Sequence, residues 1–343
     1  MKKILFIVSQ NITPTTHWWM ESIIDYLKDY NVVYSTYETA LNEYTKHHPD
    51  AVFLSYKGAQ PPSKLIGEKF WDLIKINKTK VAAWNNHEWN RLQDNDFCTN
   101  FDRKVETDLD YIFDYSWTST NVLPQINERH IYVPYGYHDW METNKSGTYD
   151  MEVSFLGCNR QLRIENDHRA EILNHLSSKF DVHVAGRWVP GQLRPTVKYY
   201  GAIGMFGGTV SQVSEFYKRS QIVLDLPWQD LSLNHFKNSL NIDKYSYLID
   251  EPMHVTYRVL EAIGSGSLLV TLDCPMHRNL GLDETNCIMY KTKLNEEAPQ
   301  VIAEAIERAL KCKQMELRRN IEKLAQNHSY RQRWHKMLTL LSE

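Results

Sequence analysis

Short, continuously apolar segments recur along this chain and alternate with helical or polar stretches. Such a segment is typical of a β-strand that is covered on both faces, and strands of that kind belong to parallel sheets. Because parallel strands need a crossover connection, the alternation predicts βαβ units rather than hairpins. In the first half of the chain the predicted strands are residues 3–8, 31–35, 51–55, 80–84, 111–116 and 130–134, and a helix is predicted at 17–28.

The second half repeats the pattern after a polar, glycine-containing stretch at residues 142–148, where we place a domain boundary. The chain has 343 residues, which is more than one hydrophobic core usually serves. We therefore expect domains at 1–145 and 146–326 and a closing segment at 327–343. In the second domain the predicted strands are 153–157, 182–185, 221–226 and 267–271, and the predicted helices are 167–179, 210–219, 257–264 and 299–311.

Charge and composition exclude several classes of protein. A net charge of -3 gives no overall attraction to phosphate polymers, and no apolar run approaches the roughly 18 residues of a membrane-spanning helix. Five cysteines, without a C-x-x-C pair, indicate neither a disulfide framework nor a zinc site. The apolar run after Lys3 is too short for a signal peptide, so we expect a cytoplasmic protein, or one in the host cytoplasm if a phage encodes it.

The most informative segment is residues 254–271, HVTYRVLEAIGSGSLLVT. A helix that begins near Thr256 presents free backbone N–H groups and a partial positive charge, which suit a pyrophosphate. Arg258 in the first turn can contact phosphate or order the loop, and Glu261 lies on the same helix face. The alternative is an amphipathic helix that carries an ordinary Arg/Glu surface pair.

This segment resembles the donor site of nucleotide-sugar glycosyltransferases with the GT-B fold, particularly the CgeB-like and group 1 types. Their pattern Ser/Thr-x-Arg-x-x-Glu-Ala-x-x-x-Gly before an apolar strand is matched from Thr256 to Gly266, and residues 153–157 and 327–333 are similar to other parts of the same fold. The resemblance implies two Rossmann-like doubly wound domains facing a cleft, with the acceptor side in the first, the donor in the second, and a C-terminal helix crossing back. It also implies metal-independent sugar transfer without a cofactor, from a UDP-sugar in preference to other donors.

The donor-side residues follow from the resemblance and from strand ends. Glu261 corresponds to the acid that accepts hydrogen bonds from ribose hydroxyls in related enzymes. Arg160 and Arg187 follow predicted strands and could form a cationic cradle for the leaving nucleoside diphosphate, although Arg187 could equally form an interdomain salt bridge. The expected donor-binding set is Gly157, Arg160, Arg187, Thr256, Tyr257, Arg258 and Glu261.

One position departs from the related retaining enzymes, which carry an acid eight residues before this Glu. That position is Met253 here. The role of the missing acid could fall to Asp250, Glu251 or His254, or be absent, and the stereochemical outcome stays open. Because of this departure, a second hypothesis stays open, in which the chain is a degenerate module that binds nucleotide or glycan without catalysis.

Catalytic and acceptor-side candidates come from the first half. His87 and Glu88 follow the predicted strand 80–84, where an α/β sheet delivers catalytic groups. His87 could act as a base or a hydrogen-bond donor, or simply cap the next helix. His17 and Trp18 lie in the first strand-to-helix loop, which lacks glycine, so we expect them to meet the acceptor rather than phosphate.

The acceptor itself has two candidate classes. One is a glycan or another hydroxyl-bearing acceptor, and the other is DNA with hydroxymethylated bases, which would need base flipping. Residues 308–336 hold nine Lys and Arg against two acids, which fits either a polyanion surface or a solvated helical pair. We therefore expect a hexosyl- or pentosyltransferase, with a DNA-modifying enzyme as the first alternative.

Overall fold

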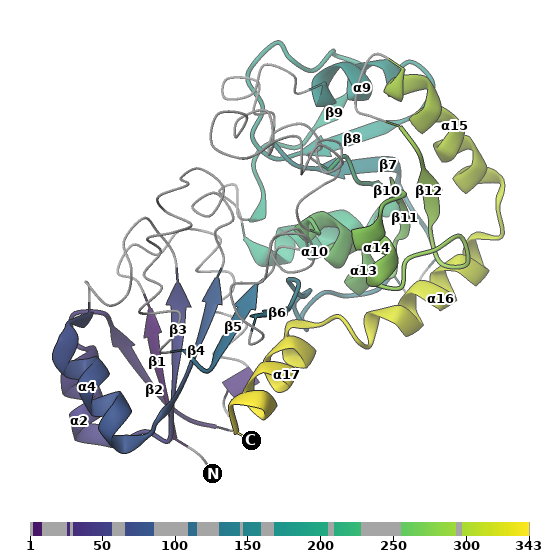
Figure 1. Ribbon diagram of the computed structural model, residues 1–343. Coiled ribbons are helices and arrows are strands. Elements are labelled where there is room, and N and C mark those ends of the chain that lie inside the picture. The colour runs from purple at the N-terminus through teal and green to yellow at the C-terminus, as the bar shows by residue number, and fades with distance from the viewer. Residues whose placement is uncertain are drawn as a thin grey trace, which may run out of the picture. The chain divides into compact units, whose positions relative to one another are not determined.

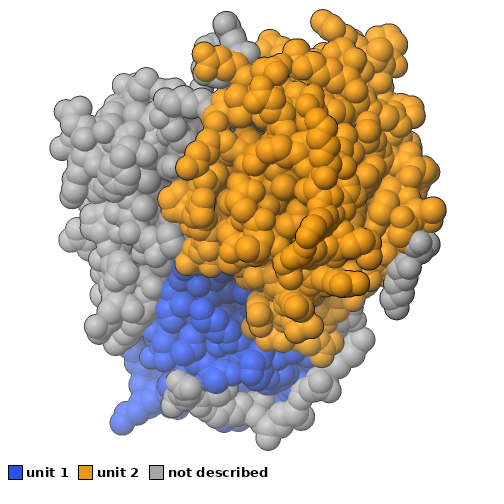
Figure 2. Space-filling view, turned by 90° about the vertical axis from the view of Figure 1, so that its right-hand side faces the viewer, with its two compact units in different colours: residues 1–134, 232–246, 333–343 blue, residues 135–231, 247–332 orange. Residues whose placement is uncertain are grey.

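Two six-stranded parallel sheets hold all the strands that the computed structural model describes (Figure 1). Each belongs to its own compact unit, and Figure 2 colours the two units separately. One unit is residues 1–134, 232–246 and 333–343, and the other is 135–231 and 247–332. The structure describes residues 3–8, 26–27, 30–56, 66–85, 109–114, 130–144, 147–158, 168–204, 209–227, 255–292 and 297–342.

The first sheet has the order β2-β1-β3-β4-β5-β6. The order reverses between β1 and β3, which is the arrangement of a doubly wound fold. Its strands are β1 (Lys3–Val8), β2 (Asn31–Thr36), β3 (Ala51–Tyr56), β4 (Lys80–Asn85), β5 (Tyr111–Asp114) and β6 (His130–Tyr132).

Apolar side chains cover both faces of this sheet, as its continuous apolar runs require. Alternate residues such as Leu5 and Val52 pack with the helices α2 (Ala40–His47) and α4 (Glu68–Asn77), which lie side by side. The residues between them turn to the other face, where Phe6 stacks on Phe53 at 5.3 Å between ring centroids. Trp334 of the last helix, α17 (Tyr330–Ser342), packs edge-on against both rings, so the chain's C-terminal helix completes the core of the first unit.

The second sheet has the order β12-β11-β10-β7-β8-β9, which is the strand order of a Rossmann fold. Helices α9 and α15 pack together, and helices α10, α13 and α16 form a second packed group. The strands are β7 (Met151–Leu156), β8 (Val182–Ala185), β9 (Lys198–Tyr199), β10 (Ser220–Leu224), β11 (Leu268–Leu272) and β12 (Ile288–Tyr290). The helices are α9 (Arg169–Leu176), α10 (Val210–Lys218), α13 (Tyr257–Ser265), α14 (Pro275–Asn279), α15 (Ala298–Lys311) and α16 (Gln314–Ala325).

The predicted parallel α/β architecture is confirmed in both halves, and every predicted strand is present with its ends moved by a few residues. The predicted strand 221–226 spans Ser220–Leu224 in the structure, and the next residue, Asp225, has its carboxylate in a polar cluster. The prediction did not include strand β9, whose two residues are exposed, or strand β12, which holds three buried residues. The predicted helix 17–28 lies almost wholly outside the described residues.

Candidate functional site

The second sheet has a topological switch point between β7 and β10, whose onward connections run in opposite directions. In open α/β sheets, ligands bind at the carboxyl ends of the strands beside such a point. Gly157 follows β7 there, and Asp225 follows β10. Helix α13 begins at the same end, since Thr256 at its amino terminus bonds to Asp225.

Asp225 is fully buried and organises this end of the sheet. Its side chain accepts hydrogen bonds from Arg258 Nη1 at 2.6 Å, from Thr256 Oγ1 at 2.9 Å and from Thr271 Oγ1 at 3.0 Å. Its carbonyl oxygen accepts one more, from the Tyr290 hydroxyl, at 2.7 Å. The carboxylate therefore joins the start of α13 to strand β11, and the carbonyl oxygen of the same residue adds a bond to strand β12.

Arg258 spans the switch point from β10 to β7. Its Nε donates to the carbonyl oxygen of Leu156 at 2.6 Å, and its guanidinium lies over the Phe155 ring, 4.1 Å from the centroid. The remaining nitrogen, Nη2, has no acceptor among the described residues. It lies beside Gly157, where an added Cβ would come within 2.8 Å of it. A side chain at position 157 would collide with the Phe155 ring, at 2.7 Å from the added Cβ, as well as with Nη2, so the position needs glycine.

The amino terminus of α13 is capped by Thr256, whose side chain accepts a hydrogen bond from the N–H of Val259. The other N–H groups of a first helical turn have no intrahelical acceptor. Tyr257, the first residue of the helix, stacks its ring on Tyr135 with 4.2 Å between centroids. Burial raises the pKa of the Tyr257 hydroxyl. The turn is thus held at its side by an aromatic pair while its N–H groups point along the helix axis.

Glu261 lies one turn further along α13, where that helix packs on α10. It is 4% exposed, and Tyr217 donates its hydroxyl hydrogen to Oε2 over 3.1 Å. Burial raises the pKa of the carboxyl to about 7, although the Tyr217 hydrogen bond and the charge of Arg258 act in the opposite direction. Its other oxygen, Oε1, has no donor within the part of the chain that the structure describes.

Strands β7 and β8 approach each other closely at their carboxyl ends. Gly157 donates its N–H to the carbonyl oxygen of Ala185, and Gly186 has a φ of 123°. A Cβ on Gly186 would lie 1.7 Å from the Gly157 carbonyl oxygen, so only glycine fits there. Arg187 follows directly and is exposed. This contact places the exposed Arg187 next to the strand end that carries Gly157.

Of the predicted site residues, the structure brings Gly157, Thr256 and Arg258 together, with Glu261 on the same helix. Tyr257 is in the same turn with its ring on Tyr135. Five predicted residues lie outside the described residues, as do the candidates for the missing acid. The five are His17, Trp18, His87, Glu88 and Arg160.

Sequence reasoning missed Asp225, Thr271 and His277. His277 is buried, with Nδ1 2.8 Å from the carbonyl oxygen of Leu272 and Nε2 4.0 Å from Asp225 Oδ2, and burial lowers its pKa. A signal for Asp225 was present, because an acid inside the apolar run QIVLDLP requires a buried partner of opposite charge. No three or more His, Cys, Asp and Glu side chains converge as metal ligands in the described ranges.

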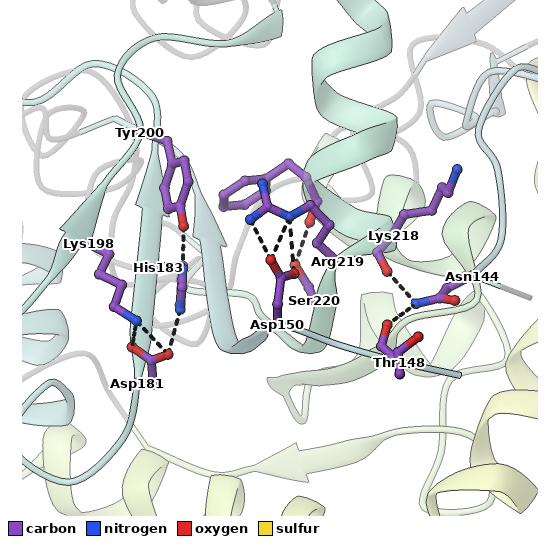
Figure 3. A network of polar contacts seen from close by, with 11 residues as sticks. Asn144, Thr148, Asp150, Asp181, His183, Lys198, Tyr200, Lys218, Arg219 and Ser220 are labelled. Carbon is purple, nitrogen blue, oxygen red and sulfur yellow. Dashed lines mark hydrogen bonds and ion pairs between the residues drawn. The ribbon is translucent and has the colours of Figure 1, made fainter. Parts of the chain in front are cut away.

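A second polar network lies at the amino ends of the same strands (Figure 3). Asp150, just before β7, pairs with Arg219, and hydrogen bonding from Arg219 lowers the pKa of the Asp150 carboxyl. Asp181, just before β8, bonds His183, whose other ring nitrogen lies 2.8 Å from the Tyr200 hydroxyl. Because ligands of open sheets bind at the opposite, carboxyl ends, we assign this network to stability.

Several cations of the basic stretch 308–336 are used inside the fold. Arg318 is 6% exposed and donates to the carbonyl oxygens of Gly266 and Gln221, and Arg308 donates to that of Met289. Further along the stretch, the guanidinium of Arg331 pairs with a carboxylate. These contacts favour the reading of the stretch as an ordinary helical pair over that of a polyanion surface.

Comparison with known proteins agrees with this fold. A family model described as glycosyl transferase-like matches residues 163–339, just over half of the chain. No curated protein matches the sequence. Among solved structures, a glycosyltransferase from Rickettsia africae is 10% identical with a TM-score of 0.66, covering 99% of this chain and 98% of that one.

Two further solved structures are similar along their whole length. Sucrose-phosphate synthase from Thermosynechococcus elongatus is 9% identical with a TM-score of 0.64, covering 100% of this chain and 98% of that one. HepE from Anabaena, solved in complex with UDP and glucose, is 11% identical with a TM-score of 0.60 and full coverage of both chains. Together with the two parallel sheets, these matches confirm the expected GT-B fold.

Proposed function

This chain belongs to the glycosyl transferase-like family, and we propose that it moves a sugar from a nucleoside diphosphate sugar, a UDP-sugar by preference, to an acceptor hydroxyl. The observation that carries the proposal is the first turn of α13 at the switch point of the second sheet, with Arg258 Nη2 beside Gly157. Free helix N–H groups and a guanidinium are the donors that a diphosphate accepts from. Similarity to HepE, which was solved with UDP and glucose, supports the choice of nucleotide.

The reaction needs a leaving group that can carry charge. The acceptor oxygen bonds to the anomeric carbon as the bond from that carbon to the β-phosphate oxygen breaks, and the hydroxyl proton passes to a base. Negative charge then develops on the β-phosphate, where the α13 amino terminus and Arg258 Nη2 can stabilise it. We propose His87 or Glu88 as the base, from their place after β4.

The other end of the donor would lie toward Glu261. Tyr217 occupies Oε2, and we propose that Oε1 accepts a hydrogen bond from a ribose hydroxyl. The carboxylate form accepts more strongly than the neutral acid. Because the pKa of this carboxyl is about 7, donor affinity should fall as the pH drops below 7.

A nucleotide panel tests the proposal. Purified protein is mixed, without added metal, with UDP, GDP, ADP, TDP and CMP and their common sugar conjugates, and melting temperature and donor hydrolysis are followed. A ligand that binds only the folded state raises the melting temperature by mass action. We expect a shift with UDP or a UDP-sugar that Arg258→Ala abolishes. If no nucleotide or sugar conjugate shifts the melting temperature and no donor is hydrolysed, the transferase activity is contradicted and a degenerate binding module is favoured.

A further inference from the structure

Asp225 is a charged residue with no access to ligand. It follows β10 in a continuously apolar segment, its side chain is 0% exposed, and all its oxygens bond inside the unit. A buried carboxylate without compensating donors is strongly unfavourable, and here Arg258 supplies the opposite charge. Any part that Asp225 takes in the reaction is therefore exerted through the groups it holds.

The group it holds most firmly is the Arg258 guanidinium. Three contacts define the plane and position of that group: Nε on the Leu156 carbonyl oxygen, Nη1 on Asp225 Oδ1, and the Phe155 ring against its face. Only the contact with Asp225 carries a full opposite charge. With Nε and Nη1 both engaged, Nη2 is the nitrogen that stays beside Gly157.

The same carboxylate also anchors Thr256, the residue that caps α13. The cap and the guanidinium are two residues apart, so one anion sets the position of both halves of the proposed diphosphate site. Burial disfavours the charged form of the neighbouring His277 and lowers its pKa, so Arg258 is the cation that balances Asp225.

We propose that Asp225 is a positioning residue of sugar transfer: it fixes Arg258 and the capped start of α13 so that Nη2 faces the β-phosphate of the donor. The inference rests on the proposed function, since it assumes a diphosphate at this helix end. It adds a residue that never touches substrate and yet sets affinity for the second phosphate. An arginine held in this way contributes to UDP binding far more than to UMP binding, because UMP lacks the β-phosphate.

The test compares UDP and UMP dissociation constants for wild type, Asp225→Asn and Arg258→Gln. Asparagine keeps the size of the side chain and can still accept from Thr256, but it removes the charge that orders Arg258. We expect Asp225→Asn to weaken UDP binding at least tenfold, to change UMP binding less than threefold, and to raise the KM for the donor along with lowering kcat. Asp225→Asn that keeps the wild-type preference for UDP over UMP would overturn the inference.

The matched control is Asp273→Asn. Asp273 follows β11 and forms an equally close pair with Arg278, with Nε to Oδ1 at 2.6 Å, but it has no contact with α13 among its described partners. Loss of this pair should leave the dissociation constants of UDP and UMP unchanged. If Asp273→Asn weakened UDP as much as Asp225→Asn does, a general loss of stability would explain the effect and the positioning role would be refuted.

The Asp225→Asn variant leaves Arg258 as a buried cation without its partner, which can prevent folding. The double variant Asp225→Asn/Arg258→Gln removes both charges and serves as a second test. Should Asp225 act through Arg258, the double variant binds UDP as Arg258→Gln does, because the two changes are not additive. A double variant that binds UDP at least fivefold more weakly than Arg258→Gln contradicts the inference. Wild-type protein that does not distinguish UDP from UMP would instead overturn the proposed function.

Discussion

Replacing Glu261 by Gln should stabilise the protein, and the gain should depend on pH. The pKa of this carboxyl is raised from 4.5 to about 7 in the folded state. A carboxyl whose folded pKa is raised binds its proton more tightly when folded, so its ionisation costs stability as the pH rises through the window from 4.5 to 7. The full cost, reached above pH 7, is about 3 kcal/mol at 1.36 kcal/mol for each pKa unit.

Urea denaturation followed by tryptophan fluorescence measures the effect. Glu261→Gln should be more stable than wild type by about 3 kcal/mol near pH 8 and by less than about 1 kcal/mol near pH 5, because there the folded carboxyl already carries its proton. Glu215→Gln, which changes an exposed acid on α10, should shift stability by less than about 0.5 kcal/mol at either pH. A Glu261→Gln difference that is equal at the two pH values, or destabilising near pH 8, would refute the burial argument.

Three other changes have defined outcomes in the same denaturation assay. Gly186→Ala should lower the free energy of unfolding by at least about 2 kcal/mol, because its Cβ would meet the Gly157 carbonyl oxygen. Gly191→Ala, which is also at positive φ but has no atom near the added Cβ, should lower it by about 1 kcal/mol. Equal losses for the two variants would contradict the close approach of β7 and β8. Trp334→Ala should cost about 3–5 kcal/mol by removing the ring that packs on the aromatic face of the first sheet, and a cost below about 1 kcal/mol would show that α17 does not complete that core. Thr256→Ala should cost about 1 kcal/mol through loss of the helix cap and should also weaken UDP binding; unchanged UDP affinity would count against the helix terminus as the phosphate site.

The parallel sheets were predictable because strands that are covered on both faces leave a record in the sequence, a short and continuously apolar run. Runs such as residues 3–8 and 51–55 are too short for a buried helix and too uniformly apolar for a half-exposed strand, and both form strands. The edge strand β9 carries no such record. Strand β9 is two exposed residues, Lys198 and Tyr199, and it is defined by backbone pairing with β8 rather than by burial.

The candidate site was predictable only in part. Thr256, Arg258 and Glu261 follow from the spacing of one motif, because a helix start is a local property. Partners far apart in sequence are not local: Asp225 meets Arg258 across 33 positions, and Tyr217 meets Glu261 across 44. Tertiary packing buries Arg258 and Glu261 and gives each its own partner, which rules out the alternative of an ordinary surface Arg/Glu pair.

Hydrogen–deuterium exchange with and without UDP tests the central claim, that a diphosphate binds at the amino terminus of α13. Apart from the N–H of Val259, which donates to the Thr256 side chain, the first-turn N–H groups lack intrahelical acceptors and should exchange quickly in the free protein. Saturating UDP should slow exchange in peptides spanning residues 255–260, whereas uridine, which has no phosphate, should leave it unchanged. Protection by UDP that leaves 255–260 unchanged and falls instead on the amino-end network around Asp181 and His183 would contradict the claim.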